Sequence, residues 1–447
     1  MTTLLTGAAV LGGEPRDLAI EDGVLVDPNA IDRDRAEVVD ATGLVALPGL
    51  VDLHAHLRQP GGEQAETVAS GVRAAAAGGF TCVFAMANTN PVADTPAVVE
   101  QVHRLGLEAG LATVRPIGAV TVGLAGERLA DMTMLARSAA RVTVFSDDGH
   151  CVHDAELMRR ALEHAAALDA VVAQHAQDPA LTRGAVMHEG PLSAELGLGG
   201  WPSVAESSIV ARDAMLAELA GARLHVCHVS TAETVEVVRA AKARGVRITA
   251  EVAPHHLLLT EDLVRSYDAR FKVNPPLRTD ADVRALREAL ADGTIDIVAT
   301  DHAPHAPEAK LSAFADASFG MVGLETALSV VQVAMVETGL LDWAGVARVM
   351  STTPAAIGRE PGYDAPLEVG SPAHVVLVDP AARAVVEERH LKGRSANSPY
   401  LGRELPGRVL HVWHAGRRTL AAGEIVTGEI VTGEIVTGQI VTGEAGR

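Results

Sequence analysis

The stretch VDLHAHLRQPG, residues 51–61, ends an apolar run with three polar side chains at alternate positions. The preceding run is too short for a helix and contains Pro48 and Gly49, so it predicts a buried strand. Alternate side chains of a strand share a face, so we expect His54, His56 and Arg58 to point the same way. Two imidazoles placed like this can bind one metal ion, although a pair of ordinary core or surface histidines is the alternative.

The sequence around this strand alternates between two patterns. Apolar, strand-like runs are separated by alanine-rich segments of helical period such as ETVASGVRAAAAG and DAELMRRALEHAAAL. After the first strand, further runs end in the segments 84–88, 115–121, 142–149, 171–178, 224–230, 248–256 and 296–304. Eight strands that alternate with helices predict an α/β fold of the (β/α)8 TIM-barrel type.

The two ends of the chain carry a different pattern of short strands and turns. We expect residues 1–47 and 368–423 to pair into one small β-sandwich domain beside a barrel at 48–367. Residues 424–447 contain EIVTG three times and then QIVTG. A period of five matches no common solenoid, so we expect a poorly ordered tail there.

Composition indicates which binding partners and which cell compartment to expect. The formal net charge of −20 argues against nucleic acid and anionic membranes. The three cysteines are widely spaced, which fits a reducing compartment. The first residues, MTTLLTGAAVLGGEPRD, have no basic region followed by an apolar core, and no apolar run is long enough for a membrane span. We therefore expect a cytoplasmic protein.

Polar residues stand at the ends of the predicted strands, where an apolar core would not need them. The carboxyl ends of barrel strands converge on one site, so these side chains should meet. A single histidine or aspartate of this kind is usually a satisfied core residue or a helix cap, but their recurrence on five strands favours a shared site. The residues are His54, His56, Arg58, Asn88, Asp147, Asp148, His175, His228, Asp301, His302 and His305.

The number of candidate ligands exceeds what one zinc ion needs. Four histidines and two carboxylates suit a two-metal centre, which requires a bridging anion from the protein. A carbamylated lysine or a carboxylate can supply this anion. The first lysine of the chain is Lys242, beyond the first five strands, so we expect a carboxylate to form the bridge. Asp148 is the first choice and Asp147 the second, because adjacent strand residues face opposite ways.

Longer sequence motifs occur along most of the chain. In order along residues 48–409 they are PGLVDLHAHLRQPG, MANTNPV, FSDDG, MHEGPLSAELGLGGWPSVAE, HVCHVST, EVAPHHLLLTE, FKVNPPLR, ATDHAPH, SFGMVGLETAL and NSPYLGRELPGRV. With these motifs the chain resembles the dihydroorotase family of the amidohydrolase superfamily, of the bacterial class I type in which an aspartate bridges two metals. HxH alone is shared with hydantoinases, allantoinases and ureases, whereas the combination of HxHLR, NTNP, NPPLR and DHAPH is specific.

The resemblance implies a metal centre and a reaction. His54 and His56 would bind one ion, His175 and His228 the other, Asp148 would bridge them, and Asp301 would touch the metal and shuttle protons. The expected cofactor is two Zn²⁺ per chain, with Co²⁺ or Mn²⁺ as substitutes. The reaction would be the reversible cyclisation of N-carbamoyl-L-aspartate to L-dihydroorotate in pyrimidine (UMP) biosynthesis, with a hydroxide between the metals as nucleophile.

The resemblance also implies substrate contacts. Arg58 offers a planar fork of donors to the substrate carboxylate. The other expected contacts are His56, Asn88, Asn274, His305, Phe319 and Gly320. The segment 305–320 is expected to be either a mobile lid or an ordinary loop.

Two alternatives remain beside this interpretation. A hydantoinase or allantoinase is a related cyclic amidase. Arg58 and Asn88 argue against this alternative, because a hydantoin has no carboxylate for them to bind. An inactive subunit that scaffolds aspartate transcarbamoylase would be expected to lose metal ligands, and every expected ligand is present. Association with aspartate transcarbamoylase and formation of a homo-oligomer are both left open by the sequence.

Overall fold

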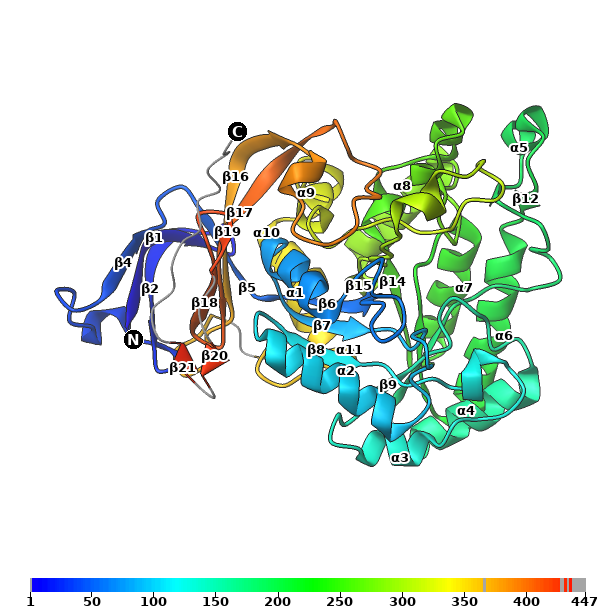
Figure 1. The fold of residues 1–447 in the computed structure, drawn as a ribbon, viewed down its shortest axis with the longest axis horizontal. Helices are drawn as coiled ribbons and strands as arrows, with labels where there is room; N and C mark the ends of the chain where they lie inside the picture. Colours follow the sequence, from blue (N-terminus) through cyan, green and yellow to red (C-terminus); the bar gives the residue numbers. More distant parts are fainter. Residues whose placement is uncertain (1, 365–366, 427–429, 432–433, 436–447) are drawn as a thin grey trace.

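The computed structural model describes residues 2–364, 367–426, 430–431 and 434–435. A barrel of strands and helices forms one end of the molecule, and a sheet built from the two ends of the chain forms the other (Figure 1).

The barrel contains eight parallel strands. One group pairs in the order β6-β7-β8 and the other in the order β15-β14-β13-β10-β9. Parallel bridges between Gly118 and Phe145 and between Ala55 and His302 join the two groups into a ring. The (β/α)8 barrel predicted from the sequence is therefore confirmed. Its strands are β6 (Leu50–Ala55), β7 (Phe80–Ala85), β8 (Thr113–Pro116), β9 (Val144–Phe145), β10 (Val171–Gln174), β13 (Arg223–Val226), β14 (Ile248–Val252) and β15 (Ile297–Val298).

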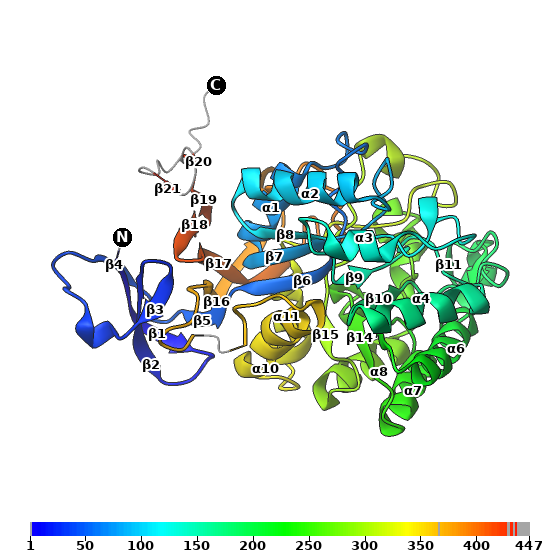
Figure 2. The same ribbon diagram turned by 90° about the horizontal axis from the view of Figure 1, so that it is seen from below.

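Helices cover the outside of this ring (Figure 2). The first of them, α1, begins at a capping box between Thr67 and Ser70 and buries small residues, so it lies close to the strands. The helices are α1 (Val68–Ala77), α2 (Pro96–Ala109), α3 (Met132–Arg137), α4 (Ala155–Ala167), α6 (Val204–Ala220), α7 (Ala232–Ala243), α8 (Asp280–Asp292), α9 (Ala327–Val331), α10 (Trp343–Ala347) and α11 (Thr353–Gly358). A small excursion after β10 contains β11 (Met187–His188), α5 (Pro191–Leu196) and β12 (Gly200–Trp201).

The interior of the barrel is apolar. Val51, Leu53, Phe84 and Ile297 belong to one buried cluster, which Tyr363 joins from the segment after α11. Ionised groups are costly in such an interior unless they are paired, so they gather where the strands end. This arrangement leaves the carboxyl-terminal mouth of the barrel as the place for chemistry.

The β-domain is one nine-stranded sheet. Its order is β19-β18-β17-β16-β5-β1-β2-β3, and β4 pairs with β1. The predicted pairing of the two chain ends is confirmed at β5, which lies antiparallel to β16 with Leu47 opposite Val376. The strands are β1 (Thr3–Val10), β2 (Pro15–Glu21), β3 (Val24–Val26), β4 (Glu37–Asp40), β5 (Val45–Pro48), β16 (Val375–Val385), β17 (Glu404–His414), β18 (Arg417–Ala421) and β19 (Glu424–Ile425).

The predicted domain limits remain predictions, and β5 spans the first of them. The first two residues of the first repeat copy belong to the sheet, because Ile425 of β19 pairs with Leu420 of β18 and is buried. Further along, β20 (Ile430–Val431) pairs with β21 (Glu434–Ile435). The remainder of the predicted tail lies outside the described residues.

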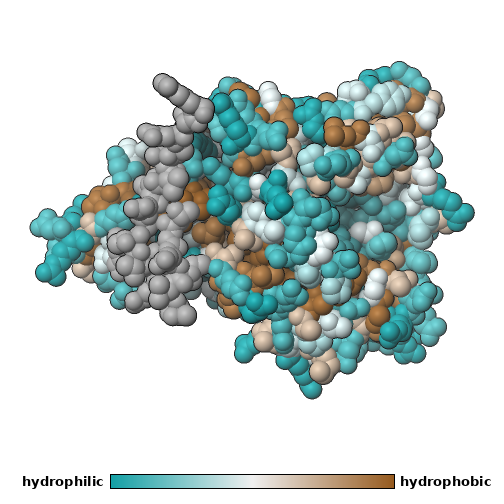
Figure 3. All heavy atoms as spheres, viewed as in Figure 1, coloured by the Kyte–Doolittle hydropathy of each residue, from teal (hydrophilic) through white to brown (hydrophobic). Residues whose placement is uncertain are grey.

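The surface carries mixed polarity. On the face drawn in Figure 3, hydrophilic residues are interspersed with hydrophobic ones over the barrel. Within the described part of the chain, the structure contains no helix that is both long enough and apolar enough to cross a membrane.

Candidate metal centre

The six predicted metal ligands come from five strands of the barrel and lie together at its mouth. All of them are buried, with exposed fractions of 5% or less. His54 lies within β6 and His56 follows it, while the others stand directly after or within three residues of the ends of β9, β10, β13 and β15: Asp148, His175, His228 and Asp301.

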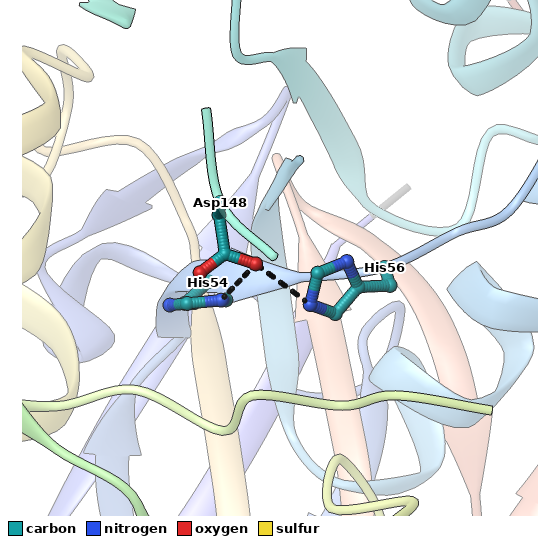
Figure 4. A group of neighbouring side chains, drawn as sticks. All are labelled: His54, His56 and Asp148. Atoms are coloured by element: carbon teal, nitrogen blue, oxygen red, sulfur yellow. Dashed lines mark ion pairs between the residues drawn. The ribbon is translucent and has the colours of Figure 1, made fainter. Parts of the chain in front are cut away.

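Asp148 lies between two pairs of histidines. Its Oδ2 is 3.4 Å from His54 Nε2 and 3.3 Å from His56 Nε2. Its Oδ1 is 3.2 Å from both His175 Nδ1 and His228 Nε2. Figure 4 shows the first half of this arrangement, with the carboxylate placed between the rings of His54 and His56. One carboxylate therefore faces two separate groups of potential ligands, as a bridging group must.

Asp301 lies beside the first pair. Its Oδ1 is 3.3 Å from His56 Nε2 and 3.6 Å from His54 Nε2. Asp301 thus faces the same space as Asp148 from the opposite side of the barrel ring. A carboxylate in this place can touch an ion and also reach a reacting group.

Asp147 has a different role. Its Oδ1 accepts hydrogen bonds from the backbone N–H groups of Val120 and Thr121, at 2.8 and 2.9 Å. The hydroxyl of Thr121 donates to its other oxygen. Both oxygens are occupied in holding the loop after β8, so the geometry favours Asp148 over Asp147 as the bridge.

The outer nitrogens of three histidines are held by hydrogen bonds. His54 Nδ1 lies 2.6 Å from Glu251 Oε1, and His56 Nδ1 lies 2.9 Å from Asn88 Oδ1. His175 Nε2 lies 2.8 Å from Gln177 Oε1. Because acceptors occupy the outer nitrogens, each ring turns its other nitrogen, with its lone pair, toward Asp148.

The donor set fits a metal ion. His54 Nε2 is buried without a hydrogen-bond partner, although it points at the centre of the cluster. A buried lone pair of this kind is costly unless something occupies it. Imidazole nitrogens and carboxylate oxygens suit zinc and similar divalent ions. Asp148 belongs to two of the groups of three side chains that could hold an ion: His54, His56 and Asp148, and Asp148, His175 and His228.

The electrostatics of the cluster agree with this assignment. Burial by itself would raise the pKa of Asp148, but the imidazoles of His54, His175 and His228 hold the pKa of that carboxyl well below its usual range. Asp148 is therefore ionised, as a bridging ligand has to be.

Backbone strain is concentrated at this mouth. His228 has φ = +34°, Asp301 has φ = +46° and Arg58 has φ = +59°. Residues other than glycine seldom adopt positive φ, and such positions gather at functional sites. All three residues stand two or three positions beyond the end of a barrel strand, where the chain leaves the strand direction.

The predicted substrate contacts on the first two strands lie beside His56. Asn88 gives its Oδ1 to His56, which leaves its amide nitrogen as a donor. That nitrogen faces Gly149, where φ is +89° and a Cβ would approach it to 3.3 Å. Arg58 Nε donates to the carbonyl of Pro304 at 3.1 Å, which ties the guanidinium to the loop after β15.

The other predicted contacts belong to two loops. Asn274 donates to Gln177 at 3.1 Å, while its own Oδ1 is buried without a hydrogen-bond partner and can accept from a ligand. His305 Nε2 lies 2.6 Å from the carbonyl oxygen of Phe319. At Gly320 φ is +125° and a Cβ would lie 2.9 Å from His305 Nε2, so a side chain there would displace this ring.

Two lysines, the buried Lys272 and the partly exposed Lys310, hold the segment 305–320 against the barrel. Lys310 donates to the carbonyls of Ala269, Lys272 and Ser318 at 3.0, 3.2 and 2.7 Å. Lys272 donates to the carbonyl of Ala315 at 2.7 Å. These contacts favour an ordinary ordered loop over a mobile lid in this conformation.

Three supporting residues were not predicted from the sequence. Glu251 and Gln177 hold His54 and His175, and Asn397 contacts the loop that carries His305. The EVAPHH motif contained Glu251, but a charged residue in a predicted strand gave no sign of what it would contact. Asn397 opens the NSPYLGRELPGRV motif, but its distance along the chain from the barrel strands gave no sign of what it would contact.

Solved structures share this architecture. The dihydropyrimidinase from Brevibacillus agri superposes with a TM-score of 0.82, at 24% identity, over 95% of this chain and 96% of that one. The L-hydantoinase from Arthrobacter aurescens gives a TM-score of 0.84, at 23% identity, over 96% and 98%. At this level of identity the likeness concerns the fold.

Sequence comparisons identify much nearer relatives. A family model described as dihydro-orotase-like matches residues 43–234. A dihydroorotase of Streptomyces coelicolor is 63% identical over 95% of this chain and 99% of its own length. Dihydroorotases of Leifsonia xyli and Mycobacterium tuberculosis are 62% and 55% identical, each over 95% of this chain and 97% and 100% of their own lengths. The chain therefore belongs to the dihydroorotase family.

Proposed function

We propose that this protein is a metal-dependent cyclic amide hydrolase that interconverts N-carbamoyl-L-aspartate and L-dihydroorotate. The names of relatives at 55–63% identity over nearly the whole chain support this substrate pair. The reaction would serve de novo pyrimidine biosynthesis. Its substrate is a small molecule, for which the barrel mouth is the expected site.

The observation that carries the proposal is the position of Asp148. Its two oxygens face His54 and His56 on one side and His175 and His228 on the other. This arrangement supports two ions with Asp148 between them, and zinc is the proposed metal because of the imidazole and carboxylate donors. Cobalt or manganese could replace it. When bound, the ions would polarise the amide carbonyl and make water acidic enough to react near neutral pH.

Asp301 is the proposed proton carrier. In the hydrolytic direction water attacks the ring carbonyl beside N3, Asp301 accepts a proton from that water, and it then donates the proton to the departing ring nitrogen. In the biosynthetic direction the carbamoyl nitrogen attacks the side-chain carboxylate and Asp301 takes its proton. Asp301 then returns that proton to the departing carboxylate oxygen, which takes up one further proton from solvent and leaves as water. The place of Asp301 beside His56, at 3.3 Å, supports this role.

Arg58 and Asn88 are proposed to orient the substrate. The guanidinium would form a paired interaction with the carboxylate that both substrates carry, and the Asn88 amide would donate to the same group. Asn274 Oδ1, buried without a partner, would accept from the ring amide N–H. His305 and the backbone of Phe319 and Gly320 would close the remaining side.

The alternatives receive less support. Hydantoinases share the fold, but a plain hydantoin has no carboxylate for Arg58 and Asn88. An inactive scaffold would have no need for six intact ligands at a shared centre. Cytoplasmic location, self-association and association with aspartate transcarbamoylase stay predictions.

One paired measurement tests the proposal. Metal content per chain would be determined on purified protein, and hydrolysis of L-dihydroorotate would be compared with hydrolysis of a plain hydantoin and of allantoin. About two ions per chain together with a strong preference for dihydroorotate is the expected result. A preference for hydantoin or allantoin would overturn the substrate assignment, and bound metal without any activity would favour the scaffold.

A further inference from the structure

We infer that Glu251 is a positioning residue that holds ligands of both metal positions in place through one buried carboxylate. The inference rests on the proposed metal centre. Glu251 lies near the end of β14, behind the metal ligands, and was not among the predicted site residues.

One oxygen of Glu251 serves both halves of the centre. Oε1 accepts a hydrogen bond from His54 Nδ1 at 2.6 Å and another from the backbone N–H of His228 at 3.2 Å. His54 faces one side of Asp148 and His228 faces the other. Removal of this oxygen would therefore release a ring in the first half and a strained backbone, at φ = +34°, in the second.

The second oxygen anchors Glu251 itself. Oε2 lies 2.9 Å from His225 Nε2, and His225 Nδ1 lies 2.8 Å from the hydroxyl of Thr249. The exposed fractions of Glu251 and His225 are both 1%. A chain of hydrogen bonds thus runs from Thr249 to the lone pair that His54 turns toward the centre, and it leaves the carboxylate little freedom to rotate.

The chemistry of the acceptor also matters. Glu251 presents an anion to His54, whereas the outer nitrogens of His56 and His175 meet neutral amides, those of Asn88 and Gln177. A carboxylate behind an imidazole fixes its tautomer and increases its basicity, so the imidazole binds a cation more strongly. The amide of glutamine has the same size and could keep the contact, but it would supply no charge.

A third group of potential ligands, His54, Cys227 and Glu251, does not compete with this interpretation. His54 Nδ1 and Glu251 Oε1 are 2.6 Å apart, which is a direct hydrogen bond and leaves no space for an ion between them. The contact is therefore structural support for the centre and not a further metal site.

Metal binding tests the role of Glu251 directly. The wild type, Glu251→Gln and Glu251→Asp would be stripped with a chelator and titrated with Zn²⁺ in competition with a chromophoric chelator. Glutamine keeps the reach and removes the charge, and aspartate keeps the charge and shortens the reach. Under the proposal both variants bind Zn²⁺ about 10–100-fold more weakly. The visible spectrum of the Co²⁺-loaded protein should change as well, since the ligand geometry changes.

The matched control is Glu360→Gln. Glu360 is a carboxylate paired with Arg115, away from the predicted ligands, and its variant should bind Zn²⁺ as the wild type does. Thermal unfolding of each apo protein reports whether it folds. If Glu251→Gln does not fold, the Zn²⁺ affinity of Glu251→Asp tests the inference instead. Wild-type Zn²⁺ affinity in a folded Glu251 variant would overturn the inference. A wild type that binds metal but leaves dihydroorotate unchanged would instead overturn the proposed function and leave the role of Glu251 standing.

Discussion

The side-chain oxygen of Asn397 accepts a hydrogen bond of 3.1 Å from the backbone N–H of His305. The amide nitrogen of Asn397 donates to the carbonyls of Ala303, at 3.0 Å, and Gly320, at 3.3 Å. One side chain, buried to 6% exposure, therefore ties the beginning of the segment 305–320 to its end. It comes from the part of the chain that connects β16 to β17.

We expect Asn397→Ala to raise KM for dihydroorotate by roughly tenfold, because three backbone groups that hold His305 and Gly320 lose their partner. The effect on kcat should be smaller, since the metal ligands are untouched, and metal content should stay at the wild-type value. Steady-state kinetics and metal analysis check this. Asn29→Ala, at the exposed edge of the β-domain, is the control, and an unchanged KM in Asn397→Ala would contradict the prediction.

Adjacent aspartates provide a sharp comparison. Asp148→Asn should lose about half or more of the bound metal, because each carboxylate oxygen faces one pair of histidines. Asp147→Asn should retain the metal and lose stability, by about 1–3 kcal/mol, since Asp147 satisfies backbone donors of Val120 and Thr121. Elemental analysis and thermal unfolding of both variants separate the two roles. Metal loss confined to Asp147→Asn would reverse the assignment.

Asp301→Asn should reduce kcat by about 10²–10⁴-fold, because the amide cannot carry a proton between water and the ring nitrogen. Metal content should fall far less than turnover. The control is Asp296→Asn, at the other end of β15, where the carboxylate pairs with Lys242. Equal losses of metal and of kcat in Asp301→Asn would point to a ligand without a role in proton transfer.

Arg58→Lys should raise KM for both dihydroorotate and N-carbamoyl-aspartate by roughly tenfold or more, because a point charge replaces a planar pair of donors. Any slow hydrolysis of a plain hydantoin should be unaffected, since that substrate has no carboxylate. Kinetics with the three substrates measure the difference. Arg73→Lys, on the exposed face of α1, serves as the control. A wild-type KM in Arg58→Lys would contradict the prediction that Arg58 binds the substrate carboxylate.

The stability of the protein should depend on pH through Glu325, whose carboxylate accepts hydrogen bonds from the backbone N–H groups of Lys392 and Gly393, between β16 and β17. Burial, together with the nearby carboxylate of Glu66, raises the pKa of Glu325 to about 7. Between the ordinary pKa near 4.5 and this value the folded state binds the extra proton, so the contribution of Glu325 to stability falls as pH rises through that window. Glu325→Gln removes the titration. Its advantage in free energy of unfolding over the wild type should grow by on the order of 2 kcal/mol from pH 5 to pH 8, measured by denaturant unfolding.

The barrel could be predicted because alternating apolar runs and helical segments are local patterns. Its ligands could be predicted because strand ends converge in this architecture. The extents of the strands could not: β9 and β15 have two residues each, where longer runs were expected. At Asp301 a positive φ ends any regular strand, and sequence alone does not reveal that the side chain must turn inward.

The supporting residues depended on tertiary contacts. Glu251 meets His54, a partner 197 residues away, and Asn397 meets His305, a partner 92 residues away. No periodicity encodes such distances. The pairing of Ile425 with Leu420 was missed for a related reason, because identical copies of EIVTG give no indication of which copy completes a sheet.

The seam between β5 and β16 has a consequence for biosynthesis of the chain. On the ribosome, residues 45–48 emerge long before Val375, so β5 must wait for almost the entire barrel before its neighbour β16 is made. Until then β5 presents an open strand edge to other nascent chains. In a chain truncated before β16 the edge of β5 would never be covered. Such a fragment would bind chaperones or aggregate even if its barrel were complete.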